Sequence, residues 1–268
     1  MAAGGTVGLG MSVNIAVKNL SKEFAAHGTG AAWKALDGVN LEVASGEFVT
    51  ILGPSGCGKS TLLNILSGLD THFTGSISFT QGDSGGTARG KPRIAYLFQE
   101  PRLLPWRTVR GNVEFALDAA GFSRSEWKGR CNKWLELVGL GGFAEFYPLQ
   151  LSGGMQQRAA IARAFSIEPD ILLMDEPFSA LDELTARRMR QELLDLWEAN
   201  RHSVVFVTHN SLEAVFLSDR ILIMNRGPSS RVRDEISLNH LPRPRSYEDP
   251  AQFETQKDVL ARLMRHVD

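Results

Sequence analysis

Residues 53–61 combine glycines, a lysine and hydroxyl side chains at a spacing that suits phosphate binding. They are Gly53, Pro54, Ser55, Gly56, Cys57, Gly58, Lys59, Ser60 and Thr61, and they lie between the apolar runs 48–52 and 62–66. The first run is expected to be a buried strand and the second the start of a helix. A G-x-x-x-x-G-K-S loop between a strand and a helix is a motif that cradles nucleotide phosphates.

Each residue type in this loop has a chemical reason to be there. Gly56 and Gly58 let successive backbone N–H groups turn towards phosphate oxygens. The helix that begins near Lys59 adds the positive end of its dipole, and the lysine can reach the outer phosphates. Ser60 can bind Mg²⁺ through its hydroxyl. An ordinary glycine turn beside a lysine is the alternative, which the flanking strand and helix disfavour.

A second group with chemical potential follows the apolar run 171–174. Asp175 and Glu176 end this run, which is expected to be a buried strand. In a parallel sheet, ligands bind at the carboxyl ends of the strands, so Asp175 is expected beside the phosphate loop, where Mg²⁺ needs a carboxylate. Glu176 would point to the other side and position a water. The alternative is a solvated pair of acids at a strand end.

The elements that would position these residues alternate between strands and helices. Strands are expected at 13–20, 39–43, 48–52, 75–80, 93–98, 171–174, 204–207 and 220–224. Helices are expected at 59–67, 109–120, 123–138, 154–166, 183–200, 211–217 and 252–266. The alternation favours an α/β fold with a mostly parallel sheet, and the alternating strands before the phosphate loop indicate an antiparallel β subdomain. Small and glycine-rich stretches at 25–32 and 81–92 are expected to be loops.

Composition narrows the class of protein. The chain has 268 residues, of which 43% are hydrophobic and 22% charged, with a net charge of −1. Such a balance suits a globular core and gives no basic field for nucleic acid, so we expect no nucleic-acid partner. Two cysteines do not make a disulfide framework, which favours a reducing compartment. Residues 1–12 are expected to be a flexible leader without signal-peptide features, and no apolar run is long enough to span a bilayer.

The most specific stretch is Leu-Ser-Gly-Gly at 151–154, where Ser152, Gly153 and Gly154 open an expected helix. It makes a second anion-binding helix end, which a single nucleotide would not need from one chain. Together with the phosphate loop and the acidic strand, in that order, the chain resembles the nucleotide-binding subunit of an ABC transporter over about residues 13–225. The resemblance implies ATP and Mg²⁺ as cofactors. It also implies a head-to-tail homodimer, in which each ATP lies between the phosphate loop of one chain and the signature helix of the other, which is the helix that Ser152 opens.

The resemblance also implies a division of the chain. Residues 13–98 and 149–226 would form the P-loop ATPase core with its antiparallel β subdomain. Residues 99–148 would form an inserted helical subdomain, against which the helix from 152 packs. Residues 227–268 would be a C-terminal tail with a helix.

Four further residues match positions of the family. Gln99 would touch Mg²⁺ or the attacking water, and His209 would hydrogen-bond the γ-phosphate and hold Glu176 in place. Asp182 lies in the loop that contacts the other subunit. Phe24 would stack on adenine, although it could equally be core, and Trp33 competes for the role.

Residues 98–106 (FQEPRLLPW) and 182–185 (DELT) resemble the nitrate/sulfonate/taurine group of importers. The resemblance implies uptake of a small solute through separate permease subunits, with an external solute-binding protein acting indirectly. Residues 99–106 would belong to the groove that receives a coupling helix of the permease, although their apolar side chains could instead be core. The expected location is peripheral, on the cytoplasmic face of the plasma membrane.

Two features depart from that group: Asn210 stands where aspartate is common, and the loop 81–91 is rich in glycine. Both weaken a substrate assignment without affecting the expected hydrolysis. The rival functions are the ATPase of an efflux or lipoprotein-extraction complex, and a non-hydrolysing regulatory ABC protein. The second would be expected to lack Glu176 or His209. Cys57 is expected to be a small filler in the loop rather than a redox switch.

Overall fold

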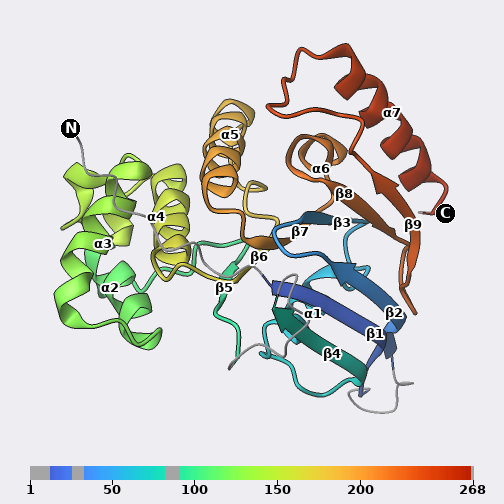
Figure 1. The fold of residues 1–268 in the computed structure, drawn as a ribbon, viewed down its shortest axis with the longest axis horizontal. Helices are drawn as coiled ribbons and strands as arrows, with labels where there is room; N and C mark the ends of the chain where they lie inside the picture. The colour runs from blue at the N-terminus through green and yellow to red at the C-terminus, as the bar shows by residue number, and fades with distance from the viewer. Residues whose placement is uncertain (1–12, 26–32, 82–90, 267–268) are drawn as a thin grey trace.

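A six-stranded sheet forms the centre of the molecule, and its order is β5-β6-β7-β3-β8-β9 (Figure 1). The computed structural model describes residues 13–25, 33–81 and 91–266. The strands of this sheet are β3 (Phe48–Leu52), β5 (Ile94–Leu97), β6 (Ile171–Asp175), β7 (Ser203–Thr208), β8 (Arg220–Met224) and β9 (Val232–Ser237). The first five in the sheet order are parallel, and β9 pairs antiparallel with β8. The middle strands are therefore buried on both faces, which accounts for their continuous apolar sequences.

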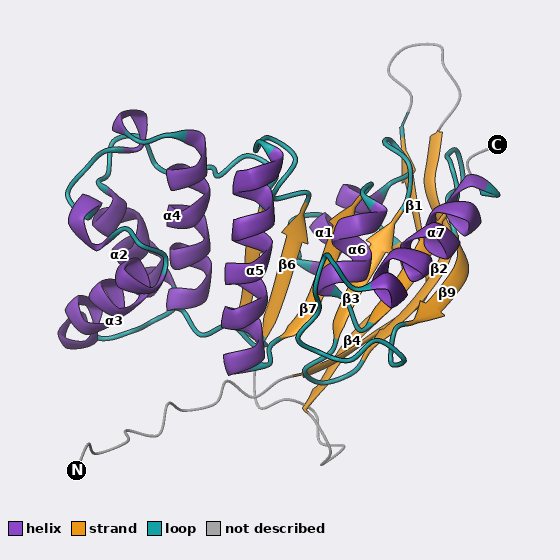
Figure 2. Cartoon of the chain, turned by 90° about the horizontal axis from the view of Figure 1, so that it is seen from above, coloured by secondary structure: helices purple, strands orange, loops and turns teal. Residues whose placement is uncertain are grey.

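A second, three-stranded sheet is wholly antiparallel, with the order β2-β1-β4. Its strands are β1 (Val13–Phe24), β2 (Trp33–Val43) and β4 (Thr74–Gln81). The helices are α1 (Lys59–Leu66), α2 (Val109–Ala119), α3 (Arg124–Leu137), α4 (Gly153–Ser166), α5 (Glu183–Asn200), α6 (Ser211–Leu217) and α7 (Pro250–Met264). Short 3₁₀ turns cover Gly141–Phe143 and Pro148–Gln150. Figure 2 shows α2, α3 and α4 gathered at one end of the molecule, with the sheets at the other.

Alternating side chains of the central strands belong to separate apolar cores. In β7, Val204 and Phe206 join the core beneath α4 and α5, whereas Val205 and Val207 join the core shared with α1 and the antiparallel sheet. Strand geometry explains this division, because successive side chains point to opposite faces. A third core joins α6, α7, β8 and β9. The phosphate loop and the acidic strand therefore belong to a sheet that is packed against an apolar core on each face.

Most of the predicted elements are confirmed, with shifts at their ends. The helix predicted from a capping box begins at Arg124, and the Glu126 carboxylate accepts a hydrogen bond from the Ser123 N–H at 3.0 Å. The strands predicted at 13–20 and 39–43 are longer than expected, because β1 and β2 pair through irregular register shifts as far as Phe24 and Trp33. The predicted leader, and most of the loops predicted at 25–32 and 81–92, lie outside the described residues.

The strand β9 was not predicted. Its sequence, Val-Arg-Asp-Glu-Ile-Ser, has two adjacent acids and few apolar residues, since it lies at an edge of the sheet and only Ile236 is buried. The C-terminal tail is therefore not a separate appendage at this point, because β9 completes the central sheet. The predicted tail helix is confirmed as α7, which packs through Val259 and Leu263 on the core of α6.

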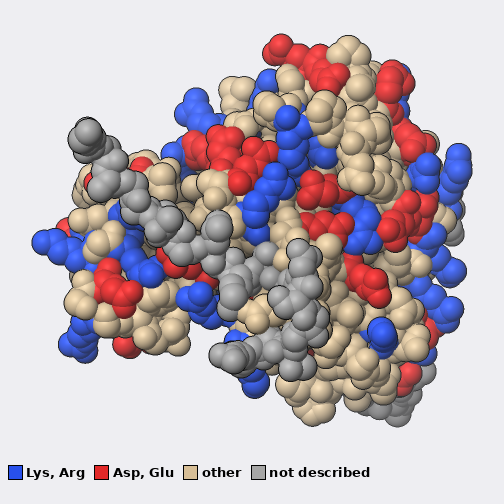
Figure 3. Space-filling model, viewed as in Figure 1, with Lys and Arg blue, Asp and Glu red and all other residues tan. Residues whose placement is uncertain are grey.

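On the face drawn in Figure 3, acidic and basic side chains are interspersed rather than gathered by sign. No helix of the described residues is long and apolar enough to cross a membrane.

The buried imidazole of His202 makes stability depend on pH. It is 2% exposed and lies edge-on to Phe165 at 5.7 Å, and burial lowers its pKa to about 4 from the ordinary 6.5. Between these two values the imidazole is protonated in the unfolded chain but neutral in the folded chain. The free energy of unfolding therefore falls as the pH drops from about 6.5 to about 4, by up to about 3 kcal/mol. Chemical denaturation across this range should show a shallower decline for His202→Gln than for the wild type. The exposed His72→Gln is the matched control, and equal slopes for wild type and His202→Gln would contradict the prediction.

Candidate functional site

The predicted site residues meet at one edge of the central sheet. Gln99 follows β5, Asp175 ends β6, His209 follows β7 and the phosphate loop follows β3. These four strands are neighbours in that order and are parallel, so their carboxyl ends share one edge. Their register aligns Asp175 with Val207 and Leu52 with Thr208. Ligands of open parallel sheets bind at this edge.

The phosphate loop has the backbone that its glycines predict. Gly56 and Gly58 adopt φ of +79° and +91°, a region that favours glycine. A Cβ on Gly58 would also lie 2.8 Å from a methyl of Leu36. The Lys59 ammonium donates hydrogen bonds to the carbonyls of Gly53 at 2.8 Å and Pro54 at 3.0 Å. The lysine is thus held within the loop with its charge at the sheet edge.

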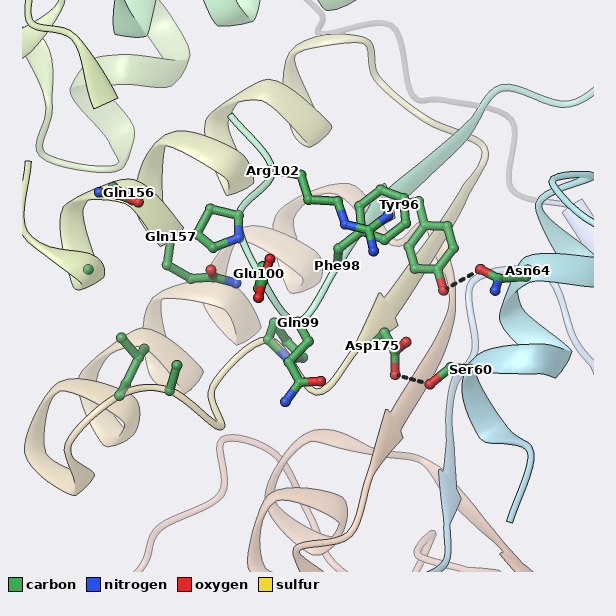
Figure 4. Close-up of a pocket in the computed structure, with 15 residues that line it drawn as sticks. Ser60, Asn64, Tyr96, Phe98, Gln99, Glu100, Arg102, Gln156, Gln157 and Asp175 are labelled. Carbon is green, nitrogen blue, oxygen red and sulfur yellow. Dashed lines mark hydrogen bonds between the residues drawn. The ribbon is translucent and has the colours of Figure 1, made fainter. Parts of the chain in front are cut away.

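Ser60 and Asp175 face each other as two oxygen ligands of a magnesium site would. The Ser60 hydroxyl donates to Asp175 Oδ1 at 3.1 Å (Figure 4). Burial raises the pKa of the Asp175 carboxyl, and the hydrogen bond from Ser60 opposes that rise. No group of three or more His, Cys, Asp or Glu side chains gathers as a metal site among the described residues. A hydroxyl and one carboxylate fit Mg²⁺, which takes few protein ligands when phosphate oxygens and waters supply the others.

Glu176 connects the lysine and the histidine. Its Oε2 lies 2.8 Å from Nδ1 of His209, and its Oε1 lies 3.6 Å from Nζ of Lys59. Glu176 has φ of +44°, a left-handed conformation that costs energy for a residue with a side chain. Its N–H donates to the Val207 carbonyl at 2.9 Å, which holds this backbone against β7. The arrangement aims a carboxylate at the edge where a water could be deprotonated.

Gln99 lies between the Ser60–Asp175 pair and α4, in a cavity of about 630 Å³ (Figure 4). Its amide donates to the Ser179 hydroxyl at 3.2 Å. The Ser179 hydroxyl in turn donates to the Glu176 carbonyl at 3.0 Å. Gln99 is therefore linked to the loop that carries Glu176, and it is exposed towards the cavity.

Asp182 serves as the N-cap of α5. Its carboxylate accepts from the Thr185 N–H at 3.0 Å, and the hydrogen bonds from Thr185 lower its pKa. Ser152 has the same structural role at α4, where its hydroxyl accepts from the Met155 N–H at 3.3 Å. Both capping residues are exposed. In Figures 1 and 2 alike, α4 lies well apart from α1, and Gly153 at its N-terminus lines the cavity that Ser60 also lines.

Phe24 and Trp33 form one aromatic pair rather than competing positions. Their rings stack at 5.9 Å with an interplanar angle of 21°, and both are partly exposed, by 39% and 45%. The pair stands near the phosphate loop, because a Cβ on Gly227 would lie 3.5 Å from the Gly56 carbonyl and 3.9 Å from the Trp33 ring. Neither ring is core, which leaves a surface on which a base could stack.

Cys57 is 1% exposed, and burial raises the pKa of its thiol. A buried thiol with a raised pKa is a poor redox centre. The cysteine fills space beneath the loop, where a Cβ on Gly53 would come within 2.9 Å of its sulfur.

Two residues at the site were not predicted. The Tyr96 hydroxyl donates to the Asn64 side chain at 3.1 Å and also interacts with the Asp175 carboxylate (Figure 4). Asn64 could have been found from its spacing, since it lies one helical turn after Ser60 and so shares its face of α1. Tyr96 carries no such signal, because it lies within an apolar strand.

Comparison with known proteins identifies the family. The model of the ABC transporter family matches residues 36–179. The aliphatic sulfonates import ATP-binding protein of Bacillus cereus is 41% identical over 250 residues, which cover 92% of this chain and 95% of that protein. The bicarbonate transport ATP-binding protein of Synechococcus elongatus is 41% identical over 256 residues, covering 93% of this chain and 38% of that protein.

Among solved structures, a dimeric ATP-binding cassette in a post-hydrolysis state with ADP and Pi is similar. It matches with a TM-score of 0.71 and 36% identity, over 84% of this chain and 99% of that one. The chain belongs to the ABC transporter family and has the fold of its ATPase subunits. The predicted fold, with an antiparallel subdomain beside a mostly parallel sheet, is confirmed.

Removing the Lys59 ammonium should abolish useful nucleotide binding. Lys59→Ala deletes the charge that the loop holds at the phosphate position, and we expect ATP affinity to fall by on the order of 10²-fold or more. Titration calorimetry with MgATP measures the effect. The exposed Lys128→Ala should bind as the wild type does, and unchanged affinity in Lys59→Ala would exclude the loop as the phosphate site.

Proposed function

We propose that this chain is the ATP-binding and ATP-hydrolysing subunit of an ABC importer that takes up a small solute. The observation that carries the proposal is the Lys59–Glu176–His209 arrangement beside the Ser60–Asp175 pair, at one sheet edge. A non-hydrolysing regulatory protein would have no need of this constellation. Family membership places it in transport, and the names of the relatives point to import.

Each residue of the edge has a part in hydrolysis. Mg²⁺, when bound with ATP, neutralises phosphate charge and orients the γ-phosphate. Ser60 and Asp175 would hold the metal, and Gln99 would reach it or the attacking water from the cavity. Glu176 would accept a proton from that water or position it, and His209 holds the Glu176 carboxylate at 2.8 Å. Lys59 and residues 53–61 would bind the phosphates, while the Phe24–Trp33 pair would stack on adenine.

The second half of the site would come from another copy of the chain. Ser152, Gly153 and Gly154 begin α4, whose N-terminus is exposed and which lies apart from α1 (Figure 1). A helix of this length presents free N–H groups that favour an anion. In a head-to-tail homodimer this end would close over the partner's ATP, and Asp182 would lie at the same interface. The dimeric form of the similar cassette supports this proposal.

Coupling to a membrane partner would use residues 99–106. Leu103 packs on the core, whereas Trp106 is 71% exposed. Of the two alternatives for this segment, core packing therefore fits Leu103 and a permease contact fits Trp106. Arg163 donates to the carbonyls of Pro101 and Arg102 at 2.9 and 2.8 Å, which ties the segment to α4. A permease helix that binds beside Trp106 could thus move both Gln99 and the signature helix.

The partners would be two permease subunits and, indirectly, an external solute-binding protein. The ATPase pair would sit at the cytoplasmic face of the plasma membrane. Relatives named for aliphatic sulfonates and bicarbonate favour a small anionic solute. Purification of the native complex, followed by identification of its permease and binding protein, tests the class of solute directly.

Replacing Glu176 by glutamine should separate binding from turnover. Glu176→Gln keeps the shape of the side chain but cannot accept a proton, so we expect ATP binding to persist, turnover to slow by on the order of 10²-fold or more, and a closed dimer to accumulate. Phosphate release and light scattering measure the two effects. Glu145→Gln, at an exposed ion pair, is the control. Wild-type turnover in Glu176→Gln would remove this residue from catalysis.

Truncating Trp106 should uncouple the subunit from its permease. In Trp106→Ala we expect ATPase activity of the isolated chain to be unchanged, because the exposed ring does not line the cavity at the site. Retention by the immobilised permease should fall about tenfold or more. The exposed Leu69→Ala should be retained like the wild type. Equal retention of Trp106→Ala and wild type would place the permease contact elsewhere.

A further inference from the structure

A buried ion pair lies directly behind the loop that carries His209. Arg190 of α5 is fully buried, and its guanidinium donates to Glu213 of α6 at 3.2 Å and to Glu183 at 2.5 Å. Glu213 is 6% exposed and accepts from the Thr208 hydroxyl at 2.6 Å. A buried pair of this kind tolerates little displacement, because separating the partners leaves an uncompensated charge.

Thr208 carries the contact from this pair to the loop. Its hydroxyl, besides donating to Glu213, accepts from the Asn210 N–H at 3.0 Å. The Asn210 side chain then caps α6 by accepting from Leu212 N–H at 2.9 Å. His209 lies between these two residues, so the backbone that aims its imidazole is fixed on both sides. Glu176, His209 and Glu213 all line one small cavity of about 170 Å³.

The C-terminal segment 238–249 holds the opposite end of α6. Arg243 donates to the Leu217 carbonyl at 2.6 Å, and Arg245 donates to the Val215 carbonyl. These are carbonyls of the last turn, which have no partner within the helix and favour positive charge. With only Ser211–Leu217, α6 is too short to be stable alone, so these contacts decide its position.

Tyr247 of the same segment covers the ion pair. Its ring stacks on Phe216 of α6 at 4.1 Å with an interplanar angle of 9°. The Arg190 guanidinium lies 5.6 Å from the ring, and that of Arg187 lies 4.5 Å from it. The ring therefore packs on both α5 and α6, the two helices that supply Arg190 and Glu213.

We propose that segment 238–249 acts as a brace: Tyr247, Arg243 and Arg245 hold α6 and the Arg190–Glu213 pair, and through Thr208 this fixes His209 against Glu176. Tyr247 and Thr208 are positioning residues, since Tyr247 acts through α5 and α6 and Thr208 through Glu213 and Asn210. The inference rests on the proposed role of His209 in hydrolysis. It makes the tail part of the catalytic machinery and gives a binder of the tail a physical route to the turnover rate.

The first test compares Tyr247→Ala with Tyr247→Phe in the full chain. Loss of the ring should lower kcat about tenfold while KM for ATP stays within about twofold, because the phosphate loop is untouched. Tyr247→Phe keeps the ring and should match the wild type, as should Phe253→Ala on the exposed side of α7. Wild-type kcat in Tyr247→Ala, or an equal change in kcat for Phe253→Ala, would overturn the brace.

A second variant avoids any general loss of packing. Thr208→Val removes only the hydroxyl between Glu213 and Asn210, and Thr208→Ser restores it. We expect kcat to fall about tenfold in the first and to recover in the second. Amide hydrogen exchange of residues 208–213 should be faster than in the wild type in Tyr247→Ala and in Thr208→Val. It should be unchanged in Tyr247→Phe, Thr208→Ser and Phe253→Ala. Unchanged exchange in both variants would overturn the proposed route.

Double variants separate this inference from the proposed function. If the brace acts through His209, Tyr247→Ala should lower kcat no further in a His209→Ala background. Full additivity, with His209→Ala itself slow, would overturn the brace and leave the role of His209 intact. Wild-type kcat in His209→Ala would instead overturn the role of His209, and the inference with it.

Discussion

The parallel pairing of β5, β6, β7 and β3 is the constraint on which the site depends. It brings residues from four distant parts of the chain to one edge, and its register sets Asp175, Thr208 and the phosphate loop side by side. Alternating side chains bury both faces of these strands in separate cores. A slip of one residue would exchange the two faces and expose apolar side chains, so packing enforces the alignment that the chemistry needs.

The charged residues at and behind this edge are held in conformations and surroundings that cost free energy. Glu176 adopts a positive φ, and Arg190 and Glu213 are buried as a pair. Such features persist where the surrounding structure determines them, and they gather at functional sites. Glu176, with its strained backbone, and Glu213 of the buried pair line one cavity with His209. In the proposed brace, the orientation of His209 and the stability of α6 depend on one short stretch of chain, and segment 238–249 would act on both.

The two helix ends that we propose to bind anions belong to α1 and α4, which lie apart. One begins at the phosphate loop, and the other begins at Ser152 on a helix set among α2 and α3. In the proposed homodimer, each subunit would hold half a site at each of these two helix ends. Nucleotide binding and the approach of a second copy would then be one event, and the exposed Trp106 segment, tied to α4 through Arg163, would be placed to respond to it.

Local patterns in the sequence were sufficient for the phosphate loop, the acidic strand, the capping box at Ser123 and nearly all helices and strands. These features depend on the spacing of residues close together in the chain, which can be recognised directly in the sequence. Only the tertiary structure decided the stacking of Phe24 on Trp33, the place of Tyr96 beside Asp175, and the strand β9, whose polar edge position hides it from periodicity. It alone brought Tyr247 to Arg190. Such contacts join residues far apart in the chain, and their energy comes from burial that no local pattern records.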